Sequence, residues 1–205
     1  MAPVLCRMRE GGAVKRFETV VAALFVDRNG PYFSMPSVDA WDESRDARGY
    51  AGPFPVVAHP PCGPWSSLRH LRVASDDREL APLAVEFVRR FGGVLEHPHT
   101  SILWPTLGLP RAGGDERDAF GGRTLLVDQC DFGHPVRKRT RLYIVSREVP
   151  PRPPPREPTH WCSGTHTPGQ RGTVPRGIKV CSATQRRRTP LAFAEFLVAI
   201  ARGAA

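Results

Sequence analysis

The stretch Phe54-Pro-Val-Val-Ala58 runs directly into His59-Pro60-Pro61-Cys62. A short apolar run rich in valine is typical of a buried strand in a parallel sheet. The run ends abruptly at a histidine and two prolines, which restrict the backbone before the cysteine, and Gly63 follows. We therefore expect a strand over 54–58 whose carboxyl end presents the Cys62 thiol.

Around this strand the chain alternates between expected strands and expected helices. The turn sequence Asp27-Arg-Asn-Gly30 predicts that the first two strands form a hairpin, and Asp39–Arg48 is expected to be a short helix or a loop. This alternation is typical of a compact α/β fold with a mostly parallel sheet, in which ligands bind at the carboxyl ends of the strands. The other expected strands lie in Phe17–Val26, Pro31–Met35, Val94-Leu95, Thr124–Val127 and Leu142–Val145, and the expected helices are Asp77–Phe91 and Pro190–Ala201.

The length of 205 residues fits one domain over 1–205. Within it we expect a catalytic α/β core over 17–148, a proline-rich basic insertion over 149–183, and a C-terminal helix over 184–202 that packs back on the core. No apolar run reaches the length of a membrane span, and the first residues do not resemble a signal peptide. The five scattered cysteines fit a reducing compartment, so we expect a cytoplasmic protein that binds no membrane.

Positive charge is concentrated in one segment. Residues 134–188 hold 13 of the 29 Lys and Arg residues but only two of the 20 Asp and Glu residues. The remainder, with 16 basic and 18 acidic residues, has a balance of −2 against a net charge of +9 for the whole chain. This distribution favours a polyanionic partner, most often nucleic acid, although a solvated basic tail is the alternative.

Four segments resemble, in order, the motifs of the cytosine-C5 DNA methyltransferases. Pro61-Cys62-Gly63-Pro64-Trp65-Ser66 resembles the family's Pro-Cys-Gln-Pro-Phe-Ser signature, and Val94–Pro98 resembles its Glu-Asn-Val motif. Asp131–Val145 is similar to Tyr-Gly-Val-Pro-Gln-x-Arg-x-Arg-x-Phe-Ile-Val, and Thr184–Ala201 to the final motif with its helix. The resemblance covers residues 55–145 and 182–201. It implies a minimal class I methyltransferase-like (Rossmann-like) core with a basic, loop-rich insertion.

The resemblance also implies roles for individual residues. Cys62 would add to C6 of cytosine and so activate C5 to accept a one-carbon group. Glu96 would recognise the exocyclic amine and hold a proton for N3, which for a buried carboxyl without a cationic partner requires a raised pKa. Arg139 and Arg141 match the Arg-x-Arg pair that contacts phosphate and stabilises the thiolate; an exposed basic strand edge is the alternative. Further substrate or DNA contacts are expected from Pro61, Gly63, Trp65, Ser66, His97, Arg137, Lys138, Arg186, Arg187 and Arg188.

The chain departs from the family in three places. Gly63 and His97-Pro98 alter the base pocket, and only about 40 residues follow Val145 before the last motif, where the family has a large target-recognition domain. Residues 1–55 lack the Phe-x-Gly-x-Gly motif that binds S-adenosylmethionine. The donor is therefore either S-adenosylmethionine bound without that motif or methylenetetrahydrofolate, as in thymidylate synthase, and the group transferred is methyl or hydroxymethyl. A partner protein that supplies missing elements is a further possibility.

Other cysteines, histidines and tryptophans allow alternatives. His160, Cys162, His166 and Cys181 would form a four-ligand zinc site, but their spacing matches no standard finger, so we expect no metal. Cys6 and Cys130 are expected to be structural. Trp65, Trp104 and Trp161 would either stack on a base flipped out of the duplex or pack in the core, and packing is favoured.

The sequence thus predicts an enzyme that modifies cytosine in DNA, and its short format suggests a phage origin. Two alternatives remain. One is a DNA-binding module of methyltransferase ancestry with reduced catalysis. The other is an enzyme that modifies or deaminates free pyrimidine nucleotides, in which the basic segment serves a single phosphate.

Overall fold

A single six-stranded sheet forms the centre of the protein. The computed structural model describes residues 20–66, 76–162, 177 and 179–204. The strand order is β2-β1-β3-β4-β6-β5, and β1 to β4 pair in parallel, whereas β6 runs antiparallel to both β4 and β5. The expected α/β class with a mostly parallel sheet is confirmed, and it is compatible with a Rossmann-like core. The strands are β1 (Val21–Leu24), β2 (Val38–Trp41), β3 (Val56–Ala58), β4 (Gly93–Pro98), β5 (Arg123–Asp128) and β6 (Arg139–Val145).

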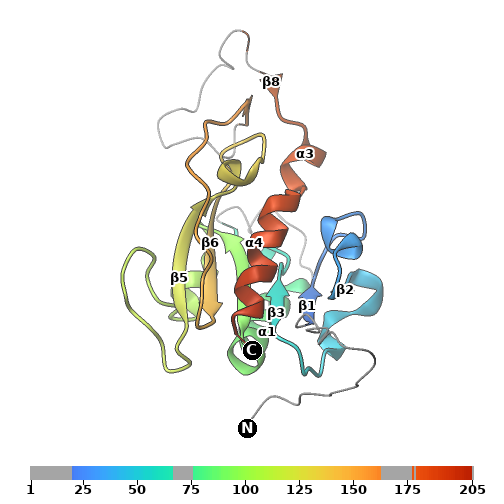
Figure 1. The fold of residues 1–205 in the computed structure, drawn as a ribbon, viewed down its shortest axis with the longest axis vertical. Helices are drawn as coiled ribbons and strands as arrows, with labels where there is room; N and C mark the ends of the chain where they lie inside the picture. Colours follow the sequence, from blue (N-terminus) through green and yellow to red (C-terminus); the bar gives the residue numbers. More distant parts are fainter. Residues whose placement is uncertain (1–19, 67–75, 163–176, 178, 205) are drawn as a thin grey trace, which may run out of the picture.

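One long helix covers each face of this sheet (Figure 1). The face with α4 (Leu191–Arg202) buries Val57, Val94 and Ile144, and the face with α1 (Leu80–Phe91) buries Leu95 and Tyr143. Both helices have apolar residues at helical spacing, which is why both are amphipathic and pack on a sheet. Short helical segments connect the strands: η1 (Pro31–Ser34), η2 (Glu43–Arg45), η3 (Ala47–Gly49), η4 (Gly63–Trp65), η6 (Asp76–Glu79), α2 (Leu103–Thr106) and η7 (Gln129–Phe132).

The parallel strands end together at one edge of the sheet, which we call the carboxyl edge. Because β6 is reversed, it begins at this edge, and its residue Thr140 pairs with Pro98 at the end of β4. Because β5 is also antiparallel to β6, it runs in the same direction as β4. Its last residue, Asp128, therefore lies at the carboxyl edge and pairs with Arg139. Loops that follow β1 to β5 and the loop that precedes β6 therefore meet here.

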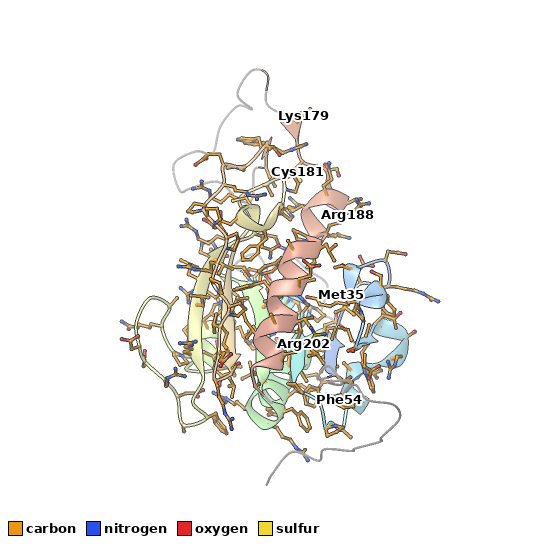
Figure 2. All side chains as sticks on the ribbon, viewed as in Figure 1. Met35, Phe54, Lys179, Cys181, Arg188 and Arg202 are labelled. Atoms are coloured by element: carbon orange, nitrogen blue, oxygen red, sulfur yellow. The ribbon has the colours of Figure 1, made fainter. Side chains whose placement is uncertain are left out.

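A smaller sheet of β7 (His160–Trp161) and β8 (Lys179–Val180) lies beyond the carboxyl edge with α3 (Ala183–Arg187), at the top of Figure 1. The backbone N–H groups of Thr159 and His160 both donate to the Pro135 carbonyl, 2.9 Å away, and so attach this segment to the core. Figure 2 shows Lys179 and Arg188 at this end of the molecule. The described residues of the basic insertion are thus held next to the carboxyl edge.

The predicted hairpin is wrong. Pro31–Ser34 forms η1 rather than a strand, and the strand next to β1 is β2, which pairs with it in parallel. Pro31 has the fixed φ that suits the first turn of a helix, and the Tyr32 side chain is buried in the core below α4. The connection from β1 to β2 therefore crosses over the sheet instead of turning back.

Two other expected elements differ in their bounds. Asp39, Ala40 and Trp41 belong to β2, so the expected helix or loop over 39–48 contains a strand end followed by η2 and η3. The C-terminal segment expected over 184–202 holds α4 together with a short helix before it, α3, and Pro190 separates the two because it cannot donate a backbone hydrogen bond within a continuous helix. The strands expected near 94–95, 124–127 and 142–145 and the helices near 77–91 and 190–201 are confirmed.

Candidate functional site

Cys62 and Glu96 come from adjacent strands at the carboxyl edge. Ala58, the last residue of β3, pairs with Leu95 of β4, so His59 lies beside Glu96. The connection Pro60-Pro61 then leads to Cys62, whose side chain is exposed. The structure therefore places a thiol and a carboxylate that are 34 positions apart in the sequence at neighbouring strand ends.

The loop that carries Cys62 is anchored by Trp65. The Trp65 N–H donates to the Cys62 carbonyl at 3.2 Å, and the buried indole donates to the Arg78 carbonyl at 3.0 Å. The Trp65 carbonyl accepts from the backbone N–H of Ile102 and from the Ser101 hydroxyl, at 3.0 and 3.2 Å. Because these contacts come from segments before α1 and after β4, the backbone around Cys62 is fixed on two sides.

Glu96 is buried and held by three side chains. Its Oε2 lies 3.1 Å from Nδ1 of His59, and its Oε1 accepts from Nε2 of Gln129 at 3.2 Å and from the Thr140 hydroxyl. Burial alone would raise the pKa of Glu96, but His59, the charge of Lys138 and the Thr140 hydroxyl outweigh it and lower this pKa. The condition for a raised pKa, a carboxyl without a cationic partner, is not met, and Glu96 is ionised near neutral pH.

His97 projects from the other face of β4. It is fully buried, its ring packs edge-on against Trp104 with centroids 6.4 Å apart, and the Pro61 carbonyl lies nearby. Within the described residues, neither ring nitrogen makes a hydrogen bond of ordinary geometry. Burial lowers the pKa of His97 to about 4, against the opposing effects of Glu96 and Pro61, so the ring is neutral at pH 7.

The predicted arginine pair separates into two environments. Arg139 is exposed and forms a two-atom ion pair with Asp128, at 3.1 and 3.2 Å. Arg141 pairs with His97 in the sheet register, and its guanidinium lies 5.7 Å from the Trp104 ring centroid. Arg141 Nε is buried without a hydrogen-bond partner among the described residues. Arg141 is therefore better placed than Arg139 to receive an anion near the Cys62 loop.

The other predicted contacts lie around the same edge or on the basic segment. Pro61, Gly63 and Ser66 flank Cys62 and are partly exposed, and Trp65 is buried as described above. Arg137 forms an ion pair with Glu157 at 3.3 Å. Arg186, Arg187 and Arg188 are exposed on and just after α3, and Arg186 also donates to the buried Cys162 sulfur at 3.6 Å. These arginines extend the positive charge beyond the carboxyl edge.

The zinc alternative receives no support from the described residues. No group of three His, Cys, Asp or Glu side chains that could hold a metal occurs among them, and His160 instead lies 2.9 Å from the Thr159 hydroxyl. His166 lies outside the described residues, as does Cys6. Cys130 is buried and donates to the Arg156 carbonyl, in line with a structural role.

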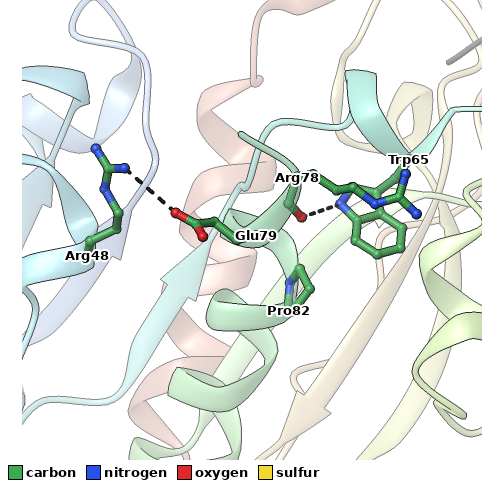
Figure 3. A pocket seen from close by; sticks show the side chains of 5 residues that line it. All are labelled: Arg48, Trp65, Arg78, Glu79 and Pro82. Carbon is green, nitrogen blue, oxygen red and sulfur yellow. Dashed lines mark hydrogen bonds and ion pairs between the residues drawn. The ribbon is translucent and has the colours of Figure 1, made fainter. Parts of the chain in front are cut away.

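Two open depressions lie near the strand ends. One, of about 530 Å³, is lined by Arg48, Trp65, Arg78, Glu79 and Pro82 (Figure 3). Its polar groups contact one another: Arg48 pairs with Glu79 at 3.8 Å, and the Arg78 guanidinium lies 5.0 Å from the Trp65 ring centroid. The other, of about 520 Å³, lies where β1 and β2 end and is lined by residues 26–28 and 42–44.

Sequence reasoning missed four residues around Glu96. The sequence pattern identifies His59 only as the end of a strand and singles out none of Tyr32, Gln129 and Thr140. The contact between Tyr32 and His59 joins residues 27 positions apart and depends on the crossover from β1 to β2. One signal was available: Thr140 lies between the two arginines of the Arg-x-Arg pair, so it faces the opposite side of β6, where Glu96 lies.

No protein-family model, curated protein or solved structure matches this chain. The resemblance to cytosine-C5 methyltransferases therefore stays a prediction from the motifs. Among the described residues, no helix has the length and apolar character needed to cross a membrane.

Proposed function

We propose that this protein modifies DNA cytosine at C5, with Cys62 as the nucleophile. The observation that carries the proposal is the meeting of three motif segments at the carboxyl edge: the Cys62 loop after β3, Glu96 and His97 on β4, and Thr140 and Arg141 on β6. Ligands of open α/β sheets bind outside the carboxyl ends of the strands. The geometry thus brings the segments that the motifs relate to one reaction to a single edge of the sheet, where Glu96 and Thr140 face one side and His97 and Arg141 face the other.

In this proposal the Cys62 thiolate adds to C6 of the base. A new C–S bond forms, and the electron pair of the C5–C6 double bond moves toward C5, which becomes nucleophilic. After C5 has taken up the one-carbon group, it loses its proton, and the C–S bond breaks to return the thiolate. The exposed position of Cys62 supports this role, since a base flipped out of the duplex must reach the sulfur.

Glu96 recognises the base as an ionised acceptor. A carboxylate at this position accepts from the exocyclic amine of cytosine, a donor that thymine lacks. Three of its lone pairs are already engaged by His59, Gln129 and Thr140, so the base meets a carboxylate of fixed orientation. Because its pKa is lowered, Glu96 does not itself bring a proton to N3 near neutral pH.

The basic residues hold the DNA backbone. Arg141 has a buried Nε without a partner among the described residues and pairs with His97, which lies near the Pro61 carbonyl, so it contacts the phosphate of the target nucleotide. The exposed arginines at 186–188 contact phosphates further along the strand. Such contacts position the protein without reading the sequence.

The depression at the ends of β1 and β2 supports S-adenosylmethionine over a folate as donor. In dinucleotide-binding α/β folds, an acidic residue near the end of the second strand accepts hydrogen bonds from the ribose. Asp42 directly follows β2 and lines this depression, and the hydrogen bonds that it accepts from Ser44 and Arg45 all go to Oδ1. Oδ2 accepts none of these hydrogen bonds and would be the atom to accept one from a ribose hydroxyl. When bound, this donor supplies an electrophilic methyl group.

We expect Asp42→Asn to weaken binding of S-adenosylmethionine by at least about tenfold, the effect of losing one charge-assisted hydrogen bond. Calorimetric titration measures the affinity. Asp46→Asn is the matched control, because Asp46 caps the next turn and does not line the depression. Binding of methylenetetrahydrofolate in place of S-adenosylmethionine would contradict the donor assignment.

The reaction is tested by nucleoside mass spectrometry of DNA incubated with the protein. Parallel reactions contain S-adenosylmethionine, methylenetetrahydrofolate or no donor, and each is repeated with Cys62→Ala. The proposal predicts a mass gain on cytosine that requires Cys62 and S-adenosylmethionine. Unchanged cytosine in every reaction, with DNA still bound, favours instead a DNA-binding module without catalysis.

A further inference from the structure

A row of three titratable side chains ends at Glu96; Tyr32 and Glu96 are buried, and His59 between them is partly buried. The Tyr32 hydroxyl lies 2.7 Å from Nε2 of His59, and Nδ1 of the same ring lies 3.1 Å from Oε2 of Glu96. The two rings are also in contact, with centroids 5.5 Å apart. The row crosses three elements, since Tyr32 lies in η1, His59 follows β3 and Glu96 lies in β4.

Each contact in this row has a defined hydrogen-bond direction. Glu96 is ionised and can only accept, so Nδ1 of His59 carries a proton and donates to Oε2. Burial and the Glu96 charge raise the pKa of Tyr32 well above its usual value, so its hydroxyl keeps its proton. The Tyr32 hydroxyl donates to Nε2 when His59 is neutral and accepts from it when His59 is an imidazolium. His59 can therefore gain or lose a proton at Nε2 without losing either partner.

We propose that His59 is the proton source that Glu96 passes to N3 of cytosine, and that Tyr32 positions His59 for this step. The inference rests on the proposed function. As Cys62 adds to C6, the Nδ1–H bond of an imidazolium His59 breaks and its proton joins Oε2 of the ionised Glu96. The new O–H bond then breaks, and the same proton joins N3. When the C–S bond later breaks, N3 returns the proton through Glu96 to His59. Over one reaction cycle His59 loses one proton and regains it, so the step needs no other reactant.

The surroundings of Glu96 explain why a second group is needed. Gln129 and Thr140 both donate to Oε1 and so stabilise the carboxylate form, as does the charge of Lys138 from the loop before β6. None of these three delivers a proton to N3, because two are not titratable in this range and Lys138 acts only through its charge. His59 is the titratable partner in contact with the other oxygen, Oε2.

Two variants separate proton supply from simple positioning. His59→Gln keeps an N–H group for Glu96 but cannot supply a proton near neutral pH, and Tyr32→Phe removes only the contact to Nε2. His99→Gln is the matched control, since His99 lies at the same edge and contacts the Arg139 carbonyl instead. The readout is the rate of covalent adduct formation with DNA that contains 5-fluorocytosine, measured against pH in the presence of S-adenosylmethionine.

For the wild type we expect a bell-shaped pH profile whose alkaline limb depends on His59. His59→Gln lowers the maximum rate by about 100-fold and removes the alkaline limb. Tyr32→Phe keeps this limb, because it removes only the contact to Nε2 of His59. His99→Gln matches the wild type. An alkaline limb that persists unchanged in a folded His59→Gln protein would overturn the inference.

Proton NMR of the protein without DNA provides a readout that is independent of catalysis. An N–H held by a carboxylate gives a far-downfield signal, which we expect for Nδ1 of His59 and expect to move upfield in Glu96→Gln. An unmoved signal would show that His59 does not donate to Glu96, and the inference fails. If the signal moves but the wild type forms no adduct at any pH, the hydrogen bond exists but the proposed function is wrong. The role of His59 as a proton source is then wrong as well.

Discussion

Glu96 has a charge state that depends on its neighbours more than on its burial. A carboxyl buried alone would hold its proton, but His59, Gln129 and Thr140 each direct a hydrogen bond at it. The sequence places Glu96 correctly near the end of a buried strand, yet apart from the position of Thr140 between the two arginines it gives no indication of these partners, which come from three other segments. The charge state of Glu96 is therefore the feature of this site that the sequence predicts least well.

The lowered pKa of Glu96 makes its contribution to stability depend on pH. A carboxyl whose pKa is lower in the folded than in the unfolded state stabilises the fold fully above the unfolded value, about 4.3, and loses this contribution as pH falls toward the folded value. We expect wild type to exceed Glu96→Gln in the free energy of unfolding at pH 6, and the difference to shrink by pH 3. Urea unfolding at a series of pH values measures it; a difference that grows toward low pH would refute the assignment.

Arg139 and Arg141 provide a matched pair at one end of β6. Arg139 is paired with Asp128, whereas Arg141 has an unpartnered buried Nε among the described residues, opposite His97. We expect Arg141→Ala to weaken DNA binding by about 1–3 kcal/mol, the range for loss of a hydrogen bond to a charged group, and Arg139→Ala to weaken it less. Competition binding at one salt concentration compares them. Equal losses of DNA affinity in Arg141→Ala and Arg139→Ala would mean that binding depends only on total charge.

At the scale of elements, the periodic segments were the most predictable. α1 and α4 follow from apolar residues at helical spacing, and β3 and β4 from short valine- and leucine-rich runs before polar residues. The hairpin failed because a turn sequence before Pro31 fits a crossover as well as a hairpin. Local sequence does not determine whether the next strand pairs antiparallel through a tight turn or parallel after a helical connection. Here η1 is that helical connection, and β2 pairs with β1 in parallel.

The pairing of β3 with β4 depends on Gly93. Its φ is +115°, and a Cβ at this position would lie 2.0 Å from the Val56 carbonyl oxygen. We expect Gly93→Ala to reduce the free energy of unfolding by at least about 2 kcal/mol from strain and backbone displacement. Gly49→Ala is the control, since nothing lies within 4 Å of a Cβ there, and it should change stability by less than about 0.5 kcal/mol. If urea unfolding gave similar changes in the free energy of unfolding for Gly93→Ala and Gly49→Ala, the close packing of Gly93 against Val56 would be contradicted.

At the scale of the whole molecule, strand order and the reversal of β6 create the site. The motif order along the chain allowed Cys62, Glu96 and Arg141 to be proposed together, but only the sheet brings β6 beside β4 with Thr140 at Glu96. The α/β class was predictable from alternating elements. The strand order was not, because it depends on which crossovers pack best over the full sheet, and one sequence pattern is compatible with several orders.

The basic segment gives the molecule a salt-dependent interaction with DNA. Arg187 and Arg188 are exposed, and Figure 2 shows Arg188 toward the same end of the molecule as Lys179. If both contact phosphates, their joint replacement by alanine reduces the slope of log affinity against log salt by about 1.8, that is about 0.9 per contact. Arg117→Ala is the control, because Arg117 lies near the start of β5 at the other edge. An unchanged slope in the double variant would mean that Arg187 and Arg188 do not contact DNA phosphates.

Covalent capture tests the central claim, attack of Cys62 on C6, most directly. In DNA that carries 5-fluorocytosine, fluorine replaces the C5 proton whose loss releases the enzyme, so a protein–DNA complex accumulates that survives denaturing electrophoresis. With S-adenosylmethionine present, we expect this complex for the wild type and for Cys181→Ala, a partly exposed cysteine in the basic segment, but not for Cys62→Ala. A complex that persists in Cys62→Ala, or its absence in wild-type protein that still binds the DNA reversibly, would contradict the account.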